Sequence, residues 1–474
     1  MGVNVKVRPE AENQPISGYT SYWNAVFNWT RFVFQRQDRV ITSVSDDGGF
    51  MQLNLSTPPP ATSGTVKVYY QNNAGTISGE ATVVTIVGSA VTIDVAYSSS
   101  FSGFVNFTNV IKNWRTEVII DKWNGSSYVP ITDGVTAIFK NLPNALVPAD
   151  LTEFLRPELS NTYSYTGTGL NFTDPYNAIQ YRVRYRENFF GATPGSYLIV
   201  QDSTGVTDVD FFAVNAALQV GDALAPNMAK YLMVDDANSG KFLSGFVEPT
   251  YFIGYPFDLS FAYPLGAGAL TWTQRWYDAN KSQIDSASQG ALTNQAGYIS
   301  RLRANAATQT SLDYDYTSIE LRESSGLFAL VSEVKFIKAK TACENPIALV
   351  WKNKLGGWDY WVFSKKHSRS TTVGNGPVFE PYLEDLSTAT AKEIVLSKTA
   401  ASIITLGAGG LDANDVDGLV GLPQSIAAYM LNSNGTVISR VTVQGGTWNV
   451  FETRKSLYEL QFNLILPSEY IQSE

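Results

Sequence analysis

The chain has 474 residues, 44% of them hydrophobic, and is therefore long enough to bury several cores in about three or four domains. Only 16% of the residues are charged, against roughly 25% in typical soluble domains, and 13% are aromatic, a balance that favours a surface covered partly by partner proteins. The formal net charge is −9 at pH 7, and no run of lysines or arginines offsets it, which argues against a nucleic-acid partner.

Neither disulfide bonds nor membrane insertion are expected. Cys343 is the single cysteine, so no internal disulfide can form, and beside a candidate strand it is interpreted as a small buried hydrophobic residue. The N-terminus lacks the apolar core of a signal peptide. No segment reaches the roughly 18 consecutive apolar residues that a membrane span requires. We therefore expect synthesis in a bacterial cytoplasm without insertion into a membrane.

The chain begins with a predicted arm and a small β domain. Residues 1–18 contain two prolines and closely spaced charges, which is typical of an extended N-terminal arm. Residues 19–115 are predicted to form a small β-barrel or sandwich, because short alternating strands recur at close spacing. Three of these strands are Val66–Tyr70, Ala81–Val87 and Val91–Tyr97.

Residues 116–205 are predicted to form a β domain with one short helix. Asn124 and Gly125 lie between two apolar runs and are a strong signal for a hairpin turn. Asp150 can cap a helix that starts after it, and Pro157 ends that helix after about one and a half turns.

The same domain carries a row of arginines at every second position. Arg182, Arg184 and Arg186 alternate with apolar residues, as expected for an amphipathic strand. We interpret the row as the solvent face of that strand, with a phosphate or polysaccharide contact as the alternative.

Two further β domains are predicted in the second half of the chain. Residues 206–340 have strand candidates at the spacing of a β-sandwich, and residues 341–474 form the C-terminal β domain. Asn434-Gly435 is predicted to be a second hairpin turn, and Tyr458–Leu466 the last strand. The predicted fold is therefore mainly β, with several antiparallel β-sandwich or small barrel domains in tandem and very little helix.

The C-terminal domain is organised around a hairpin at Asn345–Phe363, read as NPIALVWKNKLGGWDYWVF. Its second strand, Trp358–Phe363, is apolar on both faces, so it must be covered both by its own core and by another domain or subunit. A hairpin within a core is the favoured interpretation, and a subunit interface is the alternative. The interface candidates are Trp358, Tyr360, Trp361 and Phe363.

This region also resembles a known group of proteins. The residues that carry the resemblance are Cys343-Glu344-Asn345-Pro346, Trp351, Leu355-Gly356-Gly357, Asp359 and Trp361. This pattern resembles one in virion proteins of tailed phages and prophages of Bacteroidota bacteria. Those proteins are usually labelled tail, baseplate or uncharacterised structural proteins. Further segments similar to the same family are Phe34–Asp38, Phe211–Ala216, Gly254–Asp258 and Glu452–Tyr458. The resemblance implies a structural role in a virion that is assembled in the host cytoplasm, and it supplies no catalytic residues.

The sequence indicates no catalytic, cofactor or metal site. His367 is the one histidine and is predicted to lie in a polar loop, so no catalytic triad, Cys-His pair or zinc site is expected with it or with Cys343. The acidic segment Asp412–Asp417 fails the EF-hand pattern, and a polar surface turn is favoured over a looser calcium loop. Gly407–Gly410 does not have the context of a phosphate-binding loop.

Three functions follow from these observations. The first is a virion structural protein, a ring-forming or adaptor subunit of a phage tail or baseplate, which associates with its own copies and with other tail proteins. The second is a receptor-binding protein that engages host surface glycan. The third is a glycan depolymerase, because a pair of catalytic carboxylates is defined in space and not by sequence spacing. We expect a protein that is not an enzyme, and favour the first function.

Overall fold

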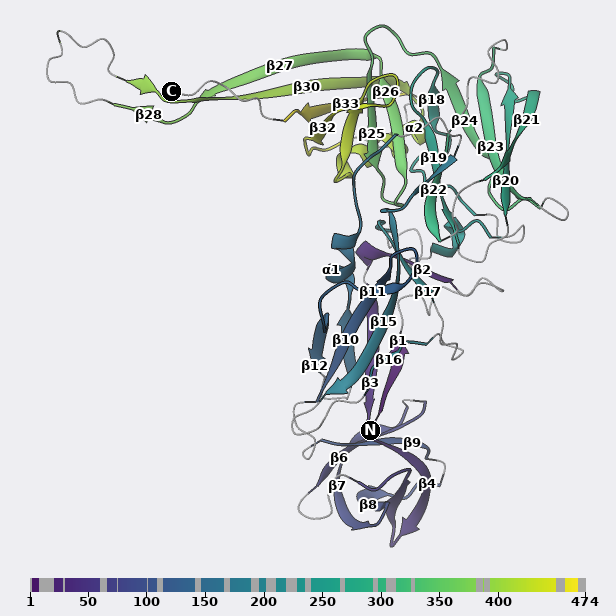
Figure 1. Ribbon diagram of the computed structural model, residues 1–474, viewed down its shortest axis with the longest axis vertical. Coiled ribbons are helices and arrows are strands. Elements are labelled where there is room, and N and C mark those ends of the chain that lie inside the picture. Colours follow the sequence, from purple (N-terminus) through teal and green to yellow (C-terminus); the bar gives the residue numbers. More distant parts are fainter. Residues whose placement is uncertain are drawn as a thin grey trace. The chain divides into compact units, whose positions relative to one another are not determined.

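The structure is a computed structural model of the chain, mainly β in architecture (Figure 1). It describes residues 2–7, 21–28, 30–59, 66–74, 76–99, 101–108, 114–140, 146–165, 171–188, 196–201, 210–218, 228–234, 240–264, 269–292, 297–303, 313–324, 329–380, 387, 393–448 and 457–467. Within these ranges the strands form several antiparallel sheets and a barrel, and the three α-helices are short. The predicted fold class is confirmed.

The chain divides into two compact units, each built from two stretches of sequence. Unit 1 consists of residues 1–158 and 179–213, and unit 2 of residues 159–178 and 214–474. The segment 159–178 thus belongs to unit 2, although it was predicted to lie inside the β domain at 116–205. None of the helices in the described ranges is long and apolar enough to cross a membrane.

Unit 1 contains a closed six-stranded barrel in the region predicted as the first β domain. Its strands run in the spatial order β4-β5-β8-β7-β6-β9. They are β4 (Arg39–Asp47), β5 (Phe50–Leu55), β6 (Lys67–Asn72), β7 (Ser78–Val87), β8 (Ala90–Ala96) and β9 (Gly103–Phe107). Every second residue of β5 points inward, and Leu53 packs there with Val68, Val91 and Phe107.

The rest of unit 1 is two packed sheets. A three-stranded sheet joins β1 (Gly2–Val7), β3 (Arg31–Gln37) and β13 (Leu146–Asp150), so residues 2–7 of the predicted arm are paired in a sheet, and residues 8–18 lie outside the described ranges. The second sheet contains β11 (Tyr128–Pro130), β10 (Arg115–Trp123), β15 (Ala178–Asn188), β17 (Asp210–Val214) and β2 (Ser21–Ala25), with β12 (Ala137–Lys140) and β16 (Leu198–Ile199) beside them. Phe211 contacts Phe32 and Tyr181, with ring centroids 5.7 and 5.6 Å apart, and so joins the two sheets.

The helix predicted after Asp150 is present and very short. Helix α1 covers Thr152–Leu155 and continues as the 3-10 turn η2 (Arg156–Glu158), with another such turn, η1, at Val26–Asn28. A carboxylate oxygen of Asp150 accepts the backbone N–H of Thr152 at 3.0 Å. The α-helix ends at Leu155, and Pro157 lies within the 3-10 turn η2, with which its fixed φ is compatible.

Unit 2 contains three main sheets. The first has the order β14 (Asn171–Asp174), β22 (Tyr298–Arg303), β19 (Asp258–Tyr263). The second has the order β18 (Thr250–Phe252), β24 (Lys335–Lys340), β23 (Tyr316–Glu323), β20 (Leu270–Tyr277), β21 (Gln283–Ala291), in which β18 and β24 are parallel. The turn η4 (Met228–Tyr231) also belongs to this unit.

The third sheet of unit 2 has seven strands. They are β26 (Trp358–Phe363), β25 (Ile347–Lys352), β31 (Ala428–Leu431), β32 (Val437–Val443), β33 (Tyr458–Ile465), β30 (Lys398–Leu411) and β27 (Lys365–Asn375), in that spatial order. Both predicted hairpins, β25–β26 and β31–β32, are confirmed. The short helices α2 (Ala413–Leu419) and α3 (Gly421–Gln424) follow β30.

Among the described residues of unit 2, one large hydrophobic core spans the two regions that were predicted as separate domains. It contains residues from Phe242 to Ile337 together with residues from Ala348 to Leu464. The boundary predicted at residue 340 therefore does not separate two cores. The sequence pattern misled here because each half contributes sheets that are apolar on one face, and these faces pack against each other.

Candidate functional site

The four interface candidates of the central hairpin are buried within the chain. Trp358, Tyr360, Trp361 and Phe363 are each at most 5% exposed. Trp361 stacks on Phe246 with ring centroids 5.8 Å apart, so residues of the same unit supply the second covering that the strand requires. The favoured interpretation of a hairpin within a core agrees with this burial.

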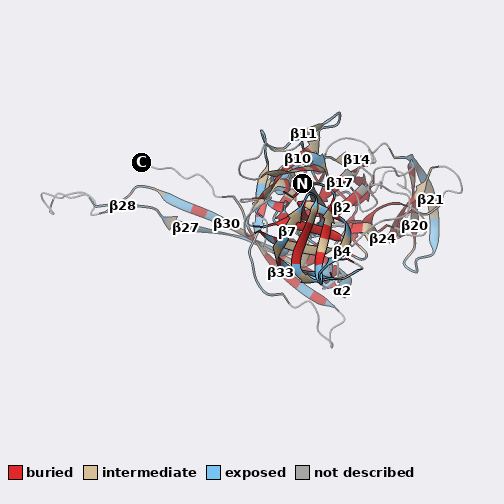
Figure 2. Cartoon of the chain, turned by 90° about the horizontal axis from the view of Figure 1, so that it is seen from below, coloured by how far each residue is buried: buried red, intermediate tan, exposed pale blue. Residues whose placement is uncertain are grey.

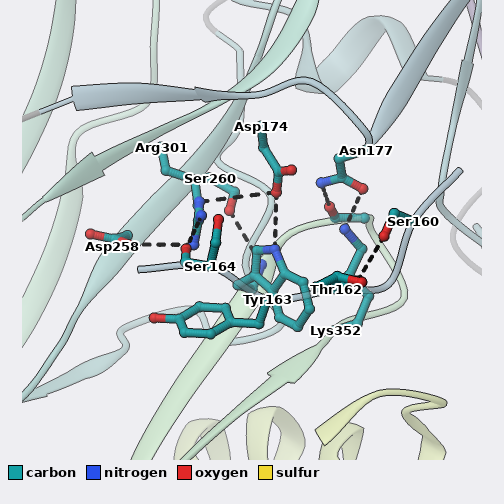
Figure 3. Close-up of polar contacts among 12 residues, drawn as sticks. Ser160, Thr162, Tyr163, Ser164, Asp174, Asn177, Asp258, Ser260, Arg301 and Lys352 are labelled. Atoms are coloured by element: carbon teal, nitrogen blue, oxygen red, sulfur yellow. Dashed lines mark hydrogen bonds and ion pairs between the residues drawn. The ribbon is translucent and has the colours of Figure 1, made fainter. Parts of the chain in front are cut away.

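A cluster of buried charged groups lies next to this strand (Figure 3). Arg301 of β22 is 1% exposed and lies between two carboxylates, with Nη1 3.6 Å from Asp258 and Nε 4.0 Å from Asp174. The indole N–H of Trp358 donates to Asp174 at 3.1 Å. The guanidinium also donates to the backbone carbonyl of Ser164 at 2.5 Å. These contacts tie the segment 159–178 to β19, β22 and β26.

Two tyrosines complete this side of the cluster. The hydroxyl of Tyr360 donates to Asp258 at 3.0 Å and lies 3.3 Å from the hydroxyl of Tyr163. Burial raises the pKa of both tyrosines well above the usual value of 10, so both stay protonated and can donate.

Lys352 lies at the other side of the cluster, at the end of β25. It is 5% exposed, and its Nζ donates to the side-chain oxygen of Asn177, whose amide donates to the carbonyl of Gly356. Burial lowers the pKa of Lys352 from 10.5 to about 7, although the charge of Asp174 opposes the shift.

Asp359 of β26 is buried on the face of that strand opposite Trp358 and Tyr360. It is 3% exposed and accepts the hydroxyl of Ser244 and the backbone N–H of Gly245, both at 2.9 Å. Burial raises the pKa of Asp359 from 3.8 to about 6, because these donors compensate only part of the lost hydration. Through the Ser244 hydroxyl and the Gly245 N–H, this buried carboxylate joins the loop at 244–245 to β26.

The charged groups of the cluster pair with one another, as expected for a structural contact. A glycosidase needs one carboxylic acid and one carboxylate that face a sugar. Here Asp174 and Asp258 face the same arginine, and Arg301 itself is almost completely buried. Buried charges that are paired in this way contribute to a unique packing, and removing one partner costs about 3–5 kcal/mol. The cluster positions the segment 159–178 and the hairpin β25–β26.

The arginine row of unit 1 is neutralised by carboxylates of the neighbouring strand. Asp121 on β10 accepts Arg182 Nε at 2.8 Å and Arg184 Nε at 2.7 Å, and Glu117 accepts Arg186 Nε at 2.6 Å. The arginine side chains are 26–30% exposed. They form cross-strand ion pairs on the more exposed face of the strand, which agrees with the interpretation as an amphipathic strand.

The acidic segment at 412–417 forms a helix start. The Asp412 carboxylate accepts the Asp415 N–H at 2.9 Å, and the two residues form a capping box for α2. Lys338 Nζ lies 2.6 Å from Asp412 and 2.9 Å from Asp415, so a cation is already supplied by the chain. In the described ranges no group of three or more His, Cys, Asp and Glu residues is placed to hold a metal.

The remaining residues singled out in the sequence also have definite places. Cys343 is exposed, which corrects its interpretation as a buried residue. His367 lies within β27 and is exposed, and it does not lie in a loop. Gly407–Gly410 belong to β30, and these small residues line two hollows. Residues 452–456 of the last similar segment lie outside the described ranges.

The feature that sequence reasoning missed is a long two-stranded arm. Strands β27 and β30 pair from Lys365 and Gly407 to Asn375 and Lys398. The pairing continues through a backbone bond from Gly376 to Ser397 into β28 (Val378–Phe379) and β29 (Ile394–Val395). The last pair between β30 and β33 is Ile403 with Ile465. Beyond it, the described strands form a ribbon of two (Figure 1).

The arm exposes apolar side chains. Val373 is 59% exposed, Val378 45%, Phe379 51% and Leu396 38%. Figure 2 shows exposed stretches along β27 and β30 where they leave the body of the sheet. An isolated two-stranded ribbon is at best marginally stable in water. A ribbon with apolar side chains in water therefore gains stability when another surface covers it.

Comparison with known proteins identifies no family. No protein-family model and no curated protein match the sequence. Among solved structures, the crystal structure of the FN1–FN3 domains of chicken CNTN1 matches 65% of this chain and 97% of its own length, at 9% identity and a TM-score of 0.15. This similarity is too low to support any argument about fold or function.

Proposed function

We propose that this protein is a structural subunit of a multi-subunit particle, of the tail or baseplate type suggested by the resemblance in its sequence. The arm formed by β27 to β30 is the observation that carries the proposal. It is a ribbon of two strands with Val378, Phe379 and Leu396 exposed, and such a ribbon is stabilised by contact with another chain.

The arrangement of the charged groups favours this role over the two alternatives. A glycan-binding face needs polar side chains that are free to bind sugar hydroxyls, whereas Arg182, Arg184 and Arg186 are held by Asp121 and Glu117. A depolymerase needs two accessible carboxylates in a cleft. The buried carboxylates described above are instead occupied by arginines and by backbone N–H groups.

The proposal is tested in particles. Tailed-phage particles are purified from a bacterial strain that carries the gene, and gold-labelled antibodies against the purified chain are applied to them. We expect labels at one defined level of the tail, and peptides of this chain among the particle proteins. The proposal fails if the chain is made in the infected or induced cells but is absent from the purified particles.

A further inference from the structure

We propose that the arm of one copy of this chain docks into a hollow at the base of the arm of a second copy. The inference rests on the proposed structural function and names the partner of the arm. We call the exposed residues Val378, Phe379 and Leu396, with the flanking Glu380 and Glu393, the hook. We call the hollow between β26 and the end of β30 the socket.

The socket is a hollow of about 450 Å³ in unit 2. Trp361, Val362 and Phe363 of β26 form one wall, and Phe252 of β18 adds to it. The opposite wall is Gly407–Leu411, where three of five residues are glycines, so much of this wall is backbone. Small residues in a strand mark places where another chain can approach closely.

The hook has a size that this socket can accept. A hollow of about 450 Å³ has room for the ring of Phe379 together with an aliphatic side chain, and its lining combines the rings of Phe252 and Trp361 with polar groups such as Thr341 and Ser364. Phe379 is 51% exposed, Val378 45% and Leu396 38%, although all three are large apolar residues. Phe379 and Leu396 lie on the same face of the ribbon, and covering these two side chains in the socket removes their apolar surface from water.

Charge complementarity favours the same partner. Glu380 and Glu393 are exposed beside the apolar hook residues, next to β28 and β29 respectively. Lys340 at the end of β24 is exposed and lines the socket, with Nζ 5.9 Å from the centre of the Trp361 ring. A negative hook and a positive rim attract each other, in a chain whose net charge of −9 would otherwise oppose self-association.

The geometry of the arm makes the contact intermolecular. The hook and the socket lie on one ribbon, because Leu396 and Gly407 are joined through paired residues of β30. Leu396 and Gly407 are eleven positions apart, which corresponds to about 36 Å at roughly 3.3 Å per residue. Continuous pairing keeps the hook from folding back into its own socket. Two different surfaces on one subunit give a head-to-tail contact, which closes into a ring or propagates as a filament.

The test uses the single cysteine of the chain as a reporter, because Cys343 is exposed and lines the socket. One protein carries Leu396→Cys together with Cys343→Ser and keeps Phe379, and the other is the parent chain. The two are mixed and oxidised, and the cross-linked pair is measured by non-reducing electrophoresis and peptide mass spectrometry. The matched control replaces Leu396→Cys with Val87→Cys, since Val87 is 72% exposed on the barrel of unit 1.

We expect a disulfide between Cys343 of one copy and the new cysteine of the other, formed well above the level of the Val87→Cys control. Equal cross-linking by both proteins would overturn the proposal, as would a hook cysteine that never reacts with Cys343. Independently, Phe379→Ala should weaken self-association by about 30-fold, as expected for an interface hot spot. An unchanged association constant for this variant also contradicts the proposal.

A charge exchange tests the orientation of the contact. Lys340→Glu alone, or Glu380→Lys with Glu393→Lys alone, should weaken self-association, and the chain that carries all three changes should regain it. If the chain with all three substitutions associates as weakly as the Lys340→Glu variant, the hook does not face Lys340. These experiments concern the partner of the arm only. A chain found in particles whose hook fails to cross-link keeps the proposed function and loses this inference.

Discussion

Lys352→Met should remove a pH dependence of stability that the buried lysine creates. Its pKa is lowered to about 7 by burial, whereas an unfolded chain holds it near 10.4. The unfolded chain therefore binds about half a proton more than the folded chain at pH 7 and nearly one more at pH 8–9, and the folded state becomes more stable as pH rises. This contribution is complete above the unfolded pKa and is lost as pH falls through about 7.

The size of the effect follows from the same shift. One pKa unit corresponds to about 1.36 kcal/mol. Because Lys352 is half protonated in the folded chain at pH 7 and almost neutral at pH 9, the parent should gain about 2 kcal/mol over this interval. Lys352 is only 5% exposed, so solvent screening reduces this little. The Lys352→Met variant should lack the gain.

The assay is urea unfolding of the full chain between pH 7 and 9. Hydrogen exchange of peptides from β25 and β26 identifies the transition that belongs to unit 2. Lys241→Met is the matched control, because Lys241 is exposed in the same unit, and it should keep the pH dependence of the parent. The reasoning is refuted if the parent and the Lys352→Met variant show the same slope with pH.

Three further substitutions test other parts of the account. Trp361→Ala should lower the free energy of unfolding by about 3–5 kcal/mol; an unchanged free energy of unfolding would contradict the burial of this residue within unit 2. Gly357→Ala should lower the melting temperature clearly, because the added methyl would lie 1.8 Å from the carbonyl oxygen of Leu243, whereas Gly445→Ala, which meets nothing within 4 Å, should not; equal melting temperatures would contradict the packing described. Asp412→Ala should cost about 1–2 kcal/mol through loss of the helix cap, and calcium should not stabilise the parent in thermal denaturation; stabilisation by calcium would revive a metal site.

The local β structure was readable from the sequence because its signals are local. Alternating apolar residues and the pairs Asn124-Gly125 and Asn434-Gly435 identified strands and turns that the structure confirms. The start of helix α2 also has a local signal, the capping box of Asp412 and Asp415, which was interpreted as a surface turn instead.

The buried cluster could not be predicted in the same way. Lys352 follows an apolar strand and looks like an exposed terminal residue, but its partner Asn177 lies 175 positions earlier in the chain. Arg301 likewise meets Asp174 through the return of segment 159–178 to unit 2. Such contacts depend on which sheets pack together, and period-two patterns carry no information about that.

The arm had a signal that was visible but ambiguous. Gly407–Gly410 is a run of small residues, and such a run is compatible both with a loop and with a strand that has few side chains. The exposed apolar residues Val378, Phe379 and Leu396 look like ordinary strand residues until the structure shows that β28 and β29 have only each other as partners among the described strands.

The central claim is that the arm holds copies of this chain together, and its removal tests this most directly. Thr371 and Ser402 are register partners, so residues 372–401 can be replaced by an Asn-Gly turn without disturbing the pairs nearer the sheet. The mass of the parent and of this shortened chain is measured by analytical ultracentrifugation across a range of concentrations, with circular dichroism to verify the fold. We predict that the parent associates with rising concentration and that the shortened, folded chain stays a monomer. Equal association of the two chains would contradict the account.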